Sequence, residues 1–332
     1  MPELRQNMAT KEWVIIATER ARRPSDFVQP SHPLTEERPE WDAGCPFCPG
    51  NEENDLEIMR IPSHGPWRVR IVGNKYPALQ RHGERLRTFD GVHRQISGVG
   101  YHEVVIEAAR HNTCAALQTP EEVALGLEAF RMRGKEIAED PRIEQIICFK
   151  NHGERAGTSL AHPHSQIVAL PMVPFAIRTR IEEALRYFDD TGRCAFCHML
   201  SEEVKARSRI VAENDNFVAF VLYAAFSPFH LWIMPRHHKS SFLHTTTQEL
   251  ADLGAILRQV LRKYYLGLRD PDFNFAIRTA PLHDPGYDYL HWYVTLVARI
   301  TSTAGFEMGS GMYINTTLPE DSAEFLRSVS AD

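Results

Sequence analysis

The chain has 332 residues, of which 43% are hydrophobic and 24% charged, and its formal net charge is −6. These proportions are typical of a globular protein and leave room for two domains of ordinary size. The acidic balance, without a dense block of Lys and Arg, argues against nucleic acid as the main partner. No apolar run of about 18 residues predicts a membrane span. The first residues lack the apolar core of a signal peptide, so we expect a cytoplasmic protein.

Cysteines give the first chemical signal. Two C-x-x-C pairs occur along the chain, and they are Cys45 with Cys48 and Cys194 with Cys197. In a cytosolic chain of this size, such pairs indicate metal binding before a disulfide. The other two cysteines, Cys114 and Cys148, lie in apolar or helix-entry surroundings, where we expect ordinary core residues.

The two pairs belong to an internal repeat. Each half contains a C-x-x-C pair, an apolar segment that ends in histidine, a helix, an apolar strand, and a last strand opened by histidine. Corresponding positions are offset by 149 at the cysteines (194 − 45), by 127 at the first histidines (238 − 111), and by 129 at the last histidines (291 − 162). Landmarks in one order at nearly constant offsets indicate that both halves share a fold.

The predicted helices both start with a capping box, in which a threonine is the N-cap and a glutamate follows three residues later. These threonines are Thr119 and Thr246. Each helix should stop near an Asp-Pro pair, at 140–141 and at 270–271, because proline and the residue before it disfavour helical backbone.

Apolar strands are expected after the helices, around 146–149 and 273–277. The change in offset implies about 22 extra residues in the first half (149 − 127), and the Gly- and Arg-rich stretch 81–100 is interpreted as this insertion, in the form of a loop. The segment 173–190 joins the halves and has the pattern of an amphipathic helix.

This arrangement predicts an α+β fold, with two similar halves that build an antiparallel sheet flanked by helices. The predicted division places the first half at 1–172 and the second half at 173–332.

Each half offers four residues of the types that bind zinc. They are Cys45, Cys48, His111 and His162 in the first half, and Cys194, Cys197, His238 and His291 in the second. The repeat selects these histidines from sixteen, although His237 remains a rival to His238. A redox-active or merely packed C-x-x-C pair is the alternative, but two pairs with matched distant histidines argue against it. Four protein ligands indicate structural sites, and thiolates beside imidazoles favour zinc, with iron an alternative in one site.

The sequence His162-Pro163-His164-Ser165-Gln166 opens the last strand of the first half. Alternate residues of a strand face the same side. We therefore expect His162 to hold the metal while His164 presents its imidazole beside it and Gln166 donates from its amide on the same surface. Histidine is partly uncharged near neutral pH and can attack phosphorus.

The alternative, non-catalytic interpretation of His164 is a further metal ligand or a buried histidine with ordinary hydrogen bonds. The second half provides an internal comparison, because His291 keeps the ligand position while Tyr293 replaces the inner histidine. This difference is expected if one position is structural and the other one chemical.

Two further segments have the composition of phosphate-binding sites. The stretch 151–161 is small, polar and Gly-containing, so its backbone N–H groups can approach phosphate oxygens, and its candidates are Asn151, Gly157, Thr158 and Ser159. Near the start, arginines able to bind phosphate in a fork are Arg20, Arg22 and Arg23. An ordinary surface turn and a solvated basic cluster are the alternatives.

These motifs resemble the galactose-1-phosphate uridylyltransferase family, within the histidine-triad superfamily. The resemblance rests on ERARRP, CPFCPGNE, VGNKYPAL, HPHSQ and GFEMGSGMYIN, which together reach over nearly the whole chain. It implies two similar, histidine-triad-like α+β halves, usually in a homodimer. It also implies ping-pong transfer, in which His164 takes a nucleoside monophosphate from a nucleotide sugar and gives it to a sugar 1-phosphate or to phosphate.

The resemblance also implies roles for individual residues. Gln166 would contact the transferred phosphoryl group, and Asn151 and Ser159 would hold phosphate oxygens. The nucleotide and sugar sites would be lined by Arg20, Arg23, Asn74 and Glu307, and some of these contacts would come from the partner subunit.

Two departures bear on the substrate. Ser165 stands where the family's uridylyltransferases commonly have Gly or Cys, and GFEMGSGMYIN lacks their glutamine near Tyr313. This segment and the complete second ligand set are similar to the ADP-glucose phosphorylase branch. The main expectation is UMP transfer between UDP-glucose and galactose 1-phosphate, and the alternative is phosphorolysis of ADP-glucose with AMP carried on His164. A histidine-triad hydrolase and a non-enzymatic zinc module are further alternatives.

Overall fold

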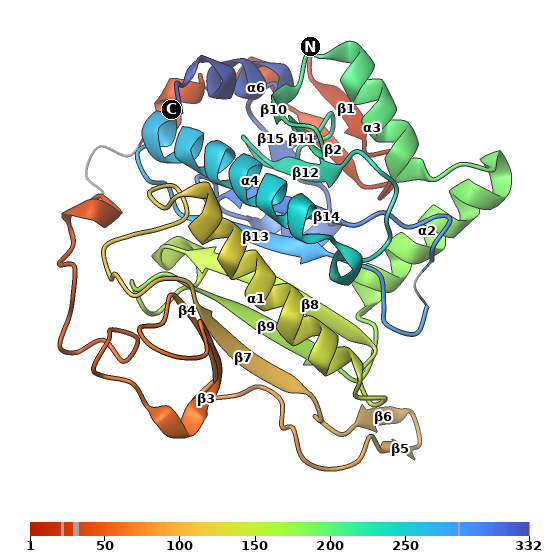
Figure 1. The fold of residues 1–332 in the computed structure, drawn as a ribbon. Coiled ribbons are helices and arrows are strands. Elements are labelled where there is room, and N and C mark those ends of the chain that lie inside the picture. Colours follow the sequence, from red (N-terminus) through yellow and green to blue (C-terminus); the bar gives the residue numbers. More distant parts are fainter. Residues whose placement is uncertain (21–22, 29–32, 285, 332) are drawn as a thin grey trace.

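The computed structural model describes residues 1–20, 23–28, 33–284 and 286–331. Its centre is a ten-stranded sheet in the order β10-β11-β12-β14-β13-β8-β9-β7-β4-β3, with every neighbouring pair antiparallel. Figure 1 shows helices α1 and α4 lying along each other across one face of this sheet. The expected α+β fold with an antiparallel sheet and flanking helices is confirmed.

The strands of the large sheet are β3 (Glu57–Ile61), β4 (Val69–Gly73), β7 (Tyr101–Ile106), β8 (Gln145–His152), β9 (His164–Leu170), β10 (Ile210–Glu213), β11 (Phe217–Val221), β12 (Leu231–Pro235), β13 (Phe273–Arg278) and β14 (Tyr293–Ala298). Two smaller sheets consist of β1 (Glu3–Gln6), β2 (Trp13–Ile16) and β15 (Tyr313–Asn315), and of β5 (Arg87–Asp90) and β6 (His93–Ile96).

The α-helices are α1 (Pro120–Ala138), α2 (Phe175–Thr191), α3 (Ala195–Ala206), α4 (Thr247–Leu268), α5 (Gly305–Ser310) and α6 (Pro319–Ser328). Short 3-10 turns are η1 (Thr18–Arg20), η2 (Pro24–Phe27), η3 (Thr35–Glu37), η4 (Asn54–Leu56), η5 (Glu154–Ala156) and η6 (Phe242–His244).

The internal repeat appears in the order of the strands. From the centre outward, the first half contributes β8, β9, β7, β4 and β3, and the second half contributes β13, β14, β12, β11 and β10. The halves meet where β8 pairs with β13, so both belong to one continuous sheet. The division at 172/173 stays a prediction. The strand order shows that equivalent strands of the two halves lie at the same distance from the centre of the sheet.

Capping starts both long helices where the sequence predicts. The hydroxyl of Thr119 accepts a hydrogen bond from the backbone N–H of Glu122, and Thr246 accepts one from Glu249. The helices end at 138 and 268, just before the two Asp-Pro pairs. Each helix buries one apolar side against the sheet, as α4 does with Leu253, which is fully buried. The caps and the apolar pattern predicted from the sequence therefore match the segments that are helical and packed against the sheet.

Two local expectations were wrong. The stretch 81–100 is not a simple loop, because β5 and β6 form a hairpin with Asp90 paired to His93 across Gly91, which has a positive φ of 56°. Asp-Gly between short alternating segments is a hairpin signal that our interpretation overlooked. The last strand of the first half begins at His164 rather than at His162. The reason is that Pro163 has no N–H to donate to a ladder.

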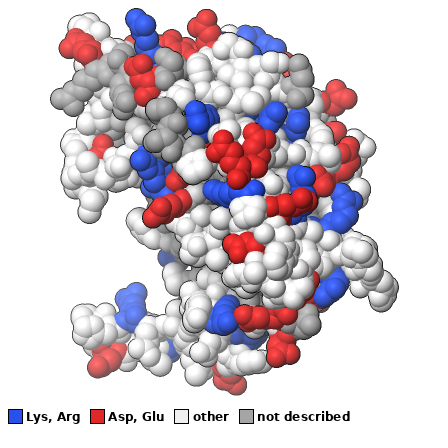
Figure 2. Space-filling view, turned by 90° about the vertical axis from the view of Figure 1, so that its left-hand side faces the viewer, with Lys and Arg blue, Asp and Glu red and all other residues white. Residues whose placement is uncertain are grey.

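Helix α2 forms where the joining segment predicts an amphipathic helix, and Cys114 and Cys148 are both buried in the core. Among the described residues, none of the helices combines the length and the apolar character needed to cross a bilayer. On the face shown in Figure 2, acidic and basic side chains are interspersed, and the surface is hollowed between the main body and a lower projection.

Candidate active site and metal clusters

His164 lies at the start of β9 with 8% of its surface exposed. Its Nδ1 is 2.8 Å from the backbone oxygen of His162, a distance at which Nδ1–H donates a hydrogen bond. This bond fixes the tautomer and leaves the lone pair on Nε2. Burial, the largest influence, lowers the pKa of His164 and favours the uncharged ring. The geometry therefore presents a neutral imidazole with a nucleophilic nitrogen.

Gln166 lies two residues along β9 and contacts His102. The Nε2 of His102 is 2.8 Å from Oε1 of Gln166, while Nδ1 of His102 accepts the backbone N–H of Ala78 at 3.0 Å. Because Nδ1 is the acceptor, Nε2 carries the proton and donates to Gln166, whose amide NH₂ then stays available for a ligand. Asn74 lies 3.1 Å from the same nitrogen of His102. His102 was missed from the sequence.

Two cavities meet at His164. One, of about 480 Å³, is lined by Asn74, Gln166, Ser159 and His164 together with the first C-x-x-C loop. The other, of about 340 Å³, is lined by Asn151, Ser159 and His164. A ligand that spans both cavities would have its central group beside Nε2.

The loop before β9 is held tightly by the second half. Gly153 has a positive φ of 84°, and a Cβ there would come within 2.0 Å of a carboxylate oxygen of Asp272. The same carboxylate accepts the backbone N–H of Arg155 at 2.6 Å. The N–H groups of Gly157 and Thr158 donate to Glu154 and Gly153 inside the loop, so they are not the free phosphate donors that we expected. Asn151 and Ser159 remain on the cavity wall.

Lys150 is a second residue that the sequence analysis missed. Its side chain is 1% exposed, and its ammonium group lies 2.5 Å from a carboxylate oxygen of Glu107 and donates to the backbone oxygen of His164 at 3.1 Å. A buried charge needs such partners. The pair ties β8 to the first residue of β9 and so fixes the position of the nucleophile. A lysine inside an apolar strand was the available signal.

The first Cys/His cluster contains the four predicted residues, all buried, with one ligand atom of each within 4.8 Å of the others. Nδ1 of His111 is 3.5 Å from Sγ of Cys48, and Nδ1 of His162 is 3.6 Å from it. The Nε2 of His162 is 2.8 Å from the backbone oxygen of Ala108, which leaves Nδ1 as the ligand atom. These distances suit a tetrahedral ion held by two sulfurs and two nitrogens.

The second cluster repeats this arrangement with Cys194, Cys197, His238 and His291. Sγ of Cys197 is 3.0 Å from Nδ1 of His238 and 3.2 Å from Nδ1 of His291. The structure brings His238 into the cluster, and His237 is exposed outside it. Both clusters therefore have donor sets that could hold a metal ion.

Several residues predicted to bind the substrate do not line the His164 cavities of the same chain. Glu307 caps its own helix through the N–H of Ala304 and is absent from the lining of both His164 cavities. Arg23 is exposed, and its N–H donates to Asp26. The side chain of Arg20 and the whole of Arg22 lie outside the described residues. Arg38, which the sequence analysis did not select, lines the smaller cavity instead.

Tyr293 occupies the place of His164 in the second half. It is 4% exposed, and its ring stacks on Trp232 with centroids 3.9 Å apart. Burial raises the pKa of its hydroxyl, so the group stays protonated at neutral pH. A protonated phenol is a poor nucleophile, and the second half therefore lacks the attacking group of the first.

Comparison with known proteins agrees with this geometry. The family models for the N-terminal and C-terminal domains of galactose-1-phosphate uridyl transferase match residues 1–174 and 180–331. An ADP-glucose phosphorylase from Arabidopsis thaliana is 38% identical over 99% of this chain and 93% of its own. A galactose-1-phosphate uridylyltransferase from Thermotoga maritima is 28% identical over the full length of both chains.

A crystal structure of the Arabidopsis ADP-glucose phosphorylase with bound ADP-glucose superimposes with a TM-score of 0.83 and 34% identity over 99% of each chain. The matches span both halves and include the segments that carry the His164 cavities and the two Cys/His clusters. The chain therefore belongs to the galactose-1-phosphate uridylyltransferase family, a family of nucleotidyltransferase enzymes.

Proposed function

We propose that this enzyme is an ADP-glucose phosphorylase, which transfers AMP from ADP-glucose to phosphate through a covalent intermediate on His164. The observation that carries the chemistry is the hydrogen bond from Nδ1 of His164 to the His162 carbonyl, which leaves Nε2 free where two cavities meet. The similarity to the Arabidopsis phosphorylase supports the choice of substrates.

The reaction runs in two displacements on phosphorus. In the first, Nε2 of His164 attacks the α-phosphorus, the bond from phosphorus to the bridging oxygen breaks, and glucose 1-phosphate leaves. In the second, an oxygen of inorganic phosphate attacks the same phosphorus, the P–N bond breaks, and ADP leaves. The neutral imidazole becomes part of a phosphoramidate in between and is regenerated at the end.

Neighbouring side chains act on the transferred group. The free amide NH₂ of Gln166 would donate to a phosphoryl oxygen, where negative charge grows in the transition state. Asn151 and Ser159 would hold the other phosphate, and Asn74 would face the nucleotide in the larger cavity. The buried Lys150 holds the strand that carries the nucleophile, which limits the loss of orientation during transfer.

Zinc is the metal that we propose for both clusters, with iron as the alternative in one. The first cluster would hold His162 and its carbonyl in place, and the second would do the same for His291, just before β14. Because four protein ligands fill a tetrahedral ion, its role would be structural.

We further propose a homodimer in the cytoplasm. Glu307 lies outside both His164 cavities of its own chain, which supports a site completed by a partner subunit. The partner's contribution would include the arginine segment near the start of the chain and the segment around Glu307.

UMP transfer between UDP-glucose and galactose 1-phosphate is the second candidate. It is supported by the two matching family models and by the relative from Thermotoga maritima. Both candidates use the same intermediate on His164, so they differ only in the base and in the acceptor.

One labelling experiment separates the candidates. The protein is incubated with ADP-glucose or UDP-glucose labelled in the α-phosphate, without acceptor, and the acid-labile, base-stable label on the protein is counted. We expect label from ADP-glucose, its release as ADP on addition of phosphate, and none on His164→Ala. The variant His237→Ala, at an exposed histidine outside the cluster, should label normally.

Label from UDP-glucose alone would move the assignment to uridylyl transfer. Label that leaves as AMP in water, with no effect of phosphate, would indicate a hydrolase. Label that persists on His164→Ala, or no label from either sugar, would overturn the proposed nucleophile.

A further inference from the structure

A second large cavity lies on the same sheet face as the active site, but over the C-terminal half. Its volume is about 520 Å³, within the roughly 300–1,000 Å³ of small-molecule pockets. The floor consists of outward-facing residues of β8, β13, β14 and β12, and one wall is the N-terminal segment around Trp13. None of its residues is a metal ligand, and neither His164 nor Gln166 lines it.

The repeat shows what this cavity corresponds to. Strand pairing places Val104 opposite Gln166 in the first half and Trp232 opposite Thr295 in the second. His102 and His230 each lie two residues before these positions, and they contact Gln166 and Thr295 respectively. The cavity lined by His230, Tyr293 and Thr295 is therefore the counterpart of the nucleotide side of the active site.

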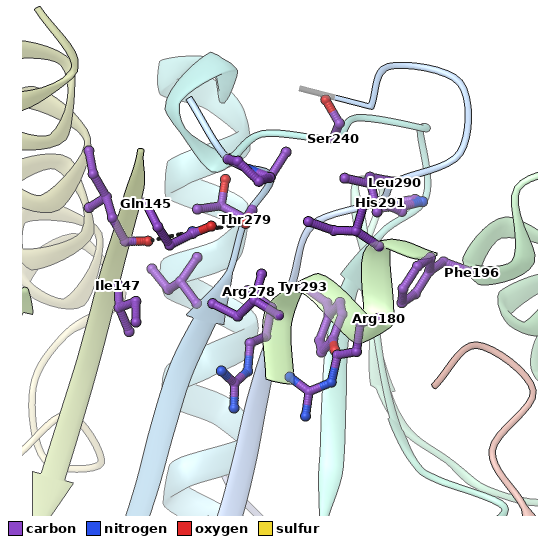
Figure 3. Close-up of a pocket in the computed structure, with 16 residues that line it drawn as sticks. Gln145, Ile147, Arg180, Phe196, Ser240, Arg278, Thr279, Leu290, His291 and Tyr293 are labelled. Carbon is purple, nitrogen blue, oxygen red and sulfur yellow. Dashed lines mark hydrogen bonds between the residues drawn. The ribbon is translucent and has the colours of Figure 1, made fainter. Parts of the chain in front are cut away.

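Positive charge gathers in this cavity. Three arginines line it, Arg180 from α2, Arg278 from the end of β13 and Arg299 just after β14, against one carboxylate among the described lining residues, that of Glu12. Figure 3, centred on a smaller neighbouring cavity, shows the guanidinium groups of Arg180 and Arg278 pointing the same way, away from Ser240. The carboxylate of Glu12 lies 3.8 Å from Arg180 and accepts a hydrogen bond from the hydroxyl of Thr10 at 2.9 Å. Guanidinium groups in such a site match the geometry of phosphate oxygens.

The aromatic rings of Phe226 and Tyr313, 4.9 Å apart, add an apolar surface suited to a base.

We propose that this cavity binds a nucleoside monophosphate, with its phosphate on Arg180 and Arg278 and its base against the aromatic wall. The bound nucleotide is not transferred, because the nucleophile position holds the buried Tyr293. The cavity adjoins the active site, because Asn151 lines both this cavity and the smaller His164 cavity, and Asn274 donates to the side-chain oxygen of Asn151 at 2.8 Å.

The test counts bound AMP per chain by equilibrium dialysis with labelled AMP on the full-length protein. We expect two equivalents on the wild type, and also on His164→Ala, which cannot form the covalent intermediate. The double variant Arg180→Gln/Arg278→Gln should lose one equivalent, with an affinity at that site lower by about tenfold or more for each arginine. It should still label at His164 from nucleotide sugar. Arg186→Gln, at an exposed arginine of α2, is the matched control and should keep both equivalents.

Adenosine should not fill the second site, because it lacks the phosphate that the arginines hold. One equivalent of AMP on the wild type, two on the double variant, or equal binding of adenosine and AMP would each overturn the proposal. So would a double variant that becomes monomeric without losing an equivalent, because the arginines would then belong to a subunit interface. Failure of labelling at His164 with the second equivalent intact would instead count against the proposed function alone.

Discussion

The two halves of this molecule share one fold and differ in a few side chains at one place. Where the first half has His164 and Gln166, the second half has Tyr293 and Thr295, while a Cys/His cluster of the same composition flanks each position. The scaffold is therefore common, and the chemistry depends on the residues that face outward from the last strand of each half. The Cys/His sets and the helix caps occur in both halves, whereas the candidate nucleophile occurs in the first half alone among the described residues.

The largest effect on the transfer rate should come from replacing the residues at which the two halves differ, His164 and Tyr293. His164→Ala should lower the transfer rate by a factor on the order of 10⁴ or more, because no other group forms the intermediate. Adding Tyr293→His to this variant should not restore transfer, since that ring lies buried against Trp232. Single-turnover release of glucose 1-phosphate measures both, and recovery in the double variant would show that the halves are chemically interchangeable.

A smaller effect on the transfer rate is expected from substitutions two residues further along β9 and β14. Gln166→Ala should slow transfer by about 100-fold, the cost of one donor to a developing charge. The matched change Thr295→Ala should leave the rate within about twofold, because Thr295 contacts His230 and no transferred group. Steady-state kcat and KM of both variants test this pair, and an equal loss in the two would contradict the assignment of Gln166.

Replacing one cysteine in each cluster should show that both clusters contribute to stability but only the first one affects labelling at His164. Cys48→Ser and Cys197→Ser should each remove one metal ion per chain and lower Tm by about 10 °C, a few kcal/mol for a chain of this size. Only Cys48→Ser should also abolish labelling at low temperature, because its cluster contains His162, whose carbonyl fixes His164. Metal analysis, thermal melting and labelling at 10 °C measure the three properties, and equal loss of labelling in both variants would break the comparison.

The smallest effect concerns pH and the second half. Burial lowers the pKa of His230 from 6.5 to about 3, so the folded protein keeps this ring neutral while the unfolded chain takes up a proton below about 6.5. Stability should then fall as pH drops from about 6.5 toward 3, by up to about 1 kcal/mol per pH unit from this group. Urea unfolding at several pH values should show a shallower loss in His230→Gln, and an unchanged slope would contradict it.

The sequence was most informative where a structure or a reaction needs one particular type of side chain. The Cys/His sets, the capping threonines and the HPHSQ motif could be located because metal geometry, helix ends and nucleophilic attack each restrict the residue type. The internal repeat then selected His111 and His238 among sixteen histidines. The hairpin at 87–96 was missed because a Gly- and Arg-rich composition was given more weight than its Asp-Gly turn.

Other parts of the site depend on contacts between distant segments. Lys150 and His102 could not be assigned from the sequence, because their roles come from Glu107, Gln166 and backbone groups brought together by strand pairing. The loop at Gly153 is shaped by Asp272 of the other half, which no local pattern encodes.

The sequence by itself therefore determined the repeated α+β plan and the two Cys/His sets and selected His164 as the candidate nucleophile, because each depends on residue type and spacing. Tertiary structure decided which nitrogen of His164 is free, which groups surround it, and that the second half forms a cationic cavity in place of a second reaction site. The physical reason is that tautomer, burial and charge depend on what lies across the sheet, and antiparallel pairing of β8 with β13 joins residues more than 120 positions apart, as in the bond between Asn151 and Asn274.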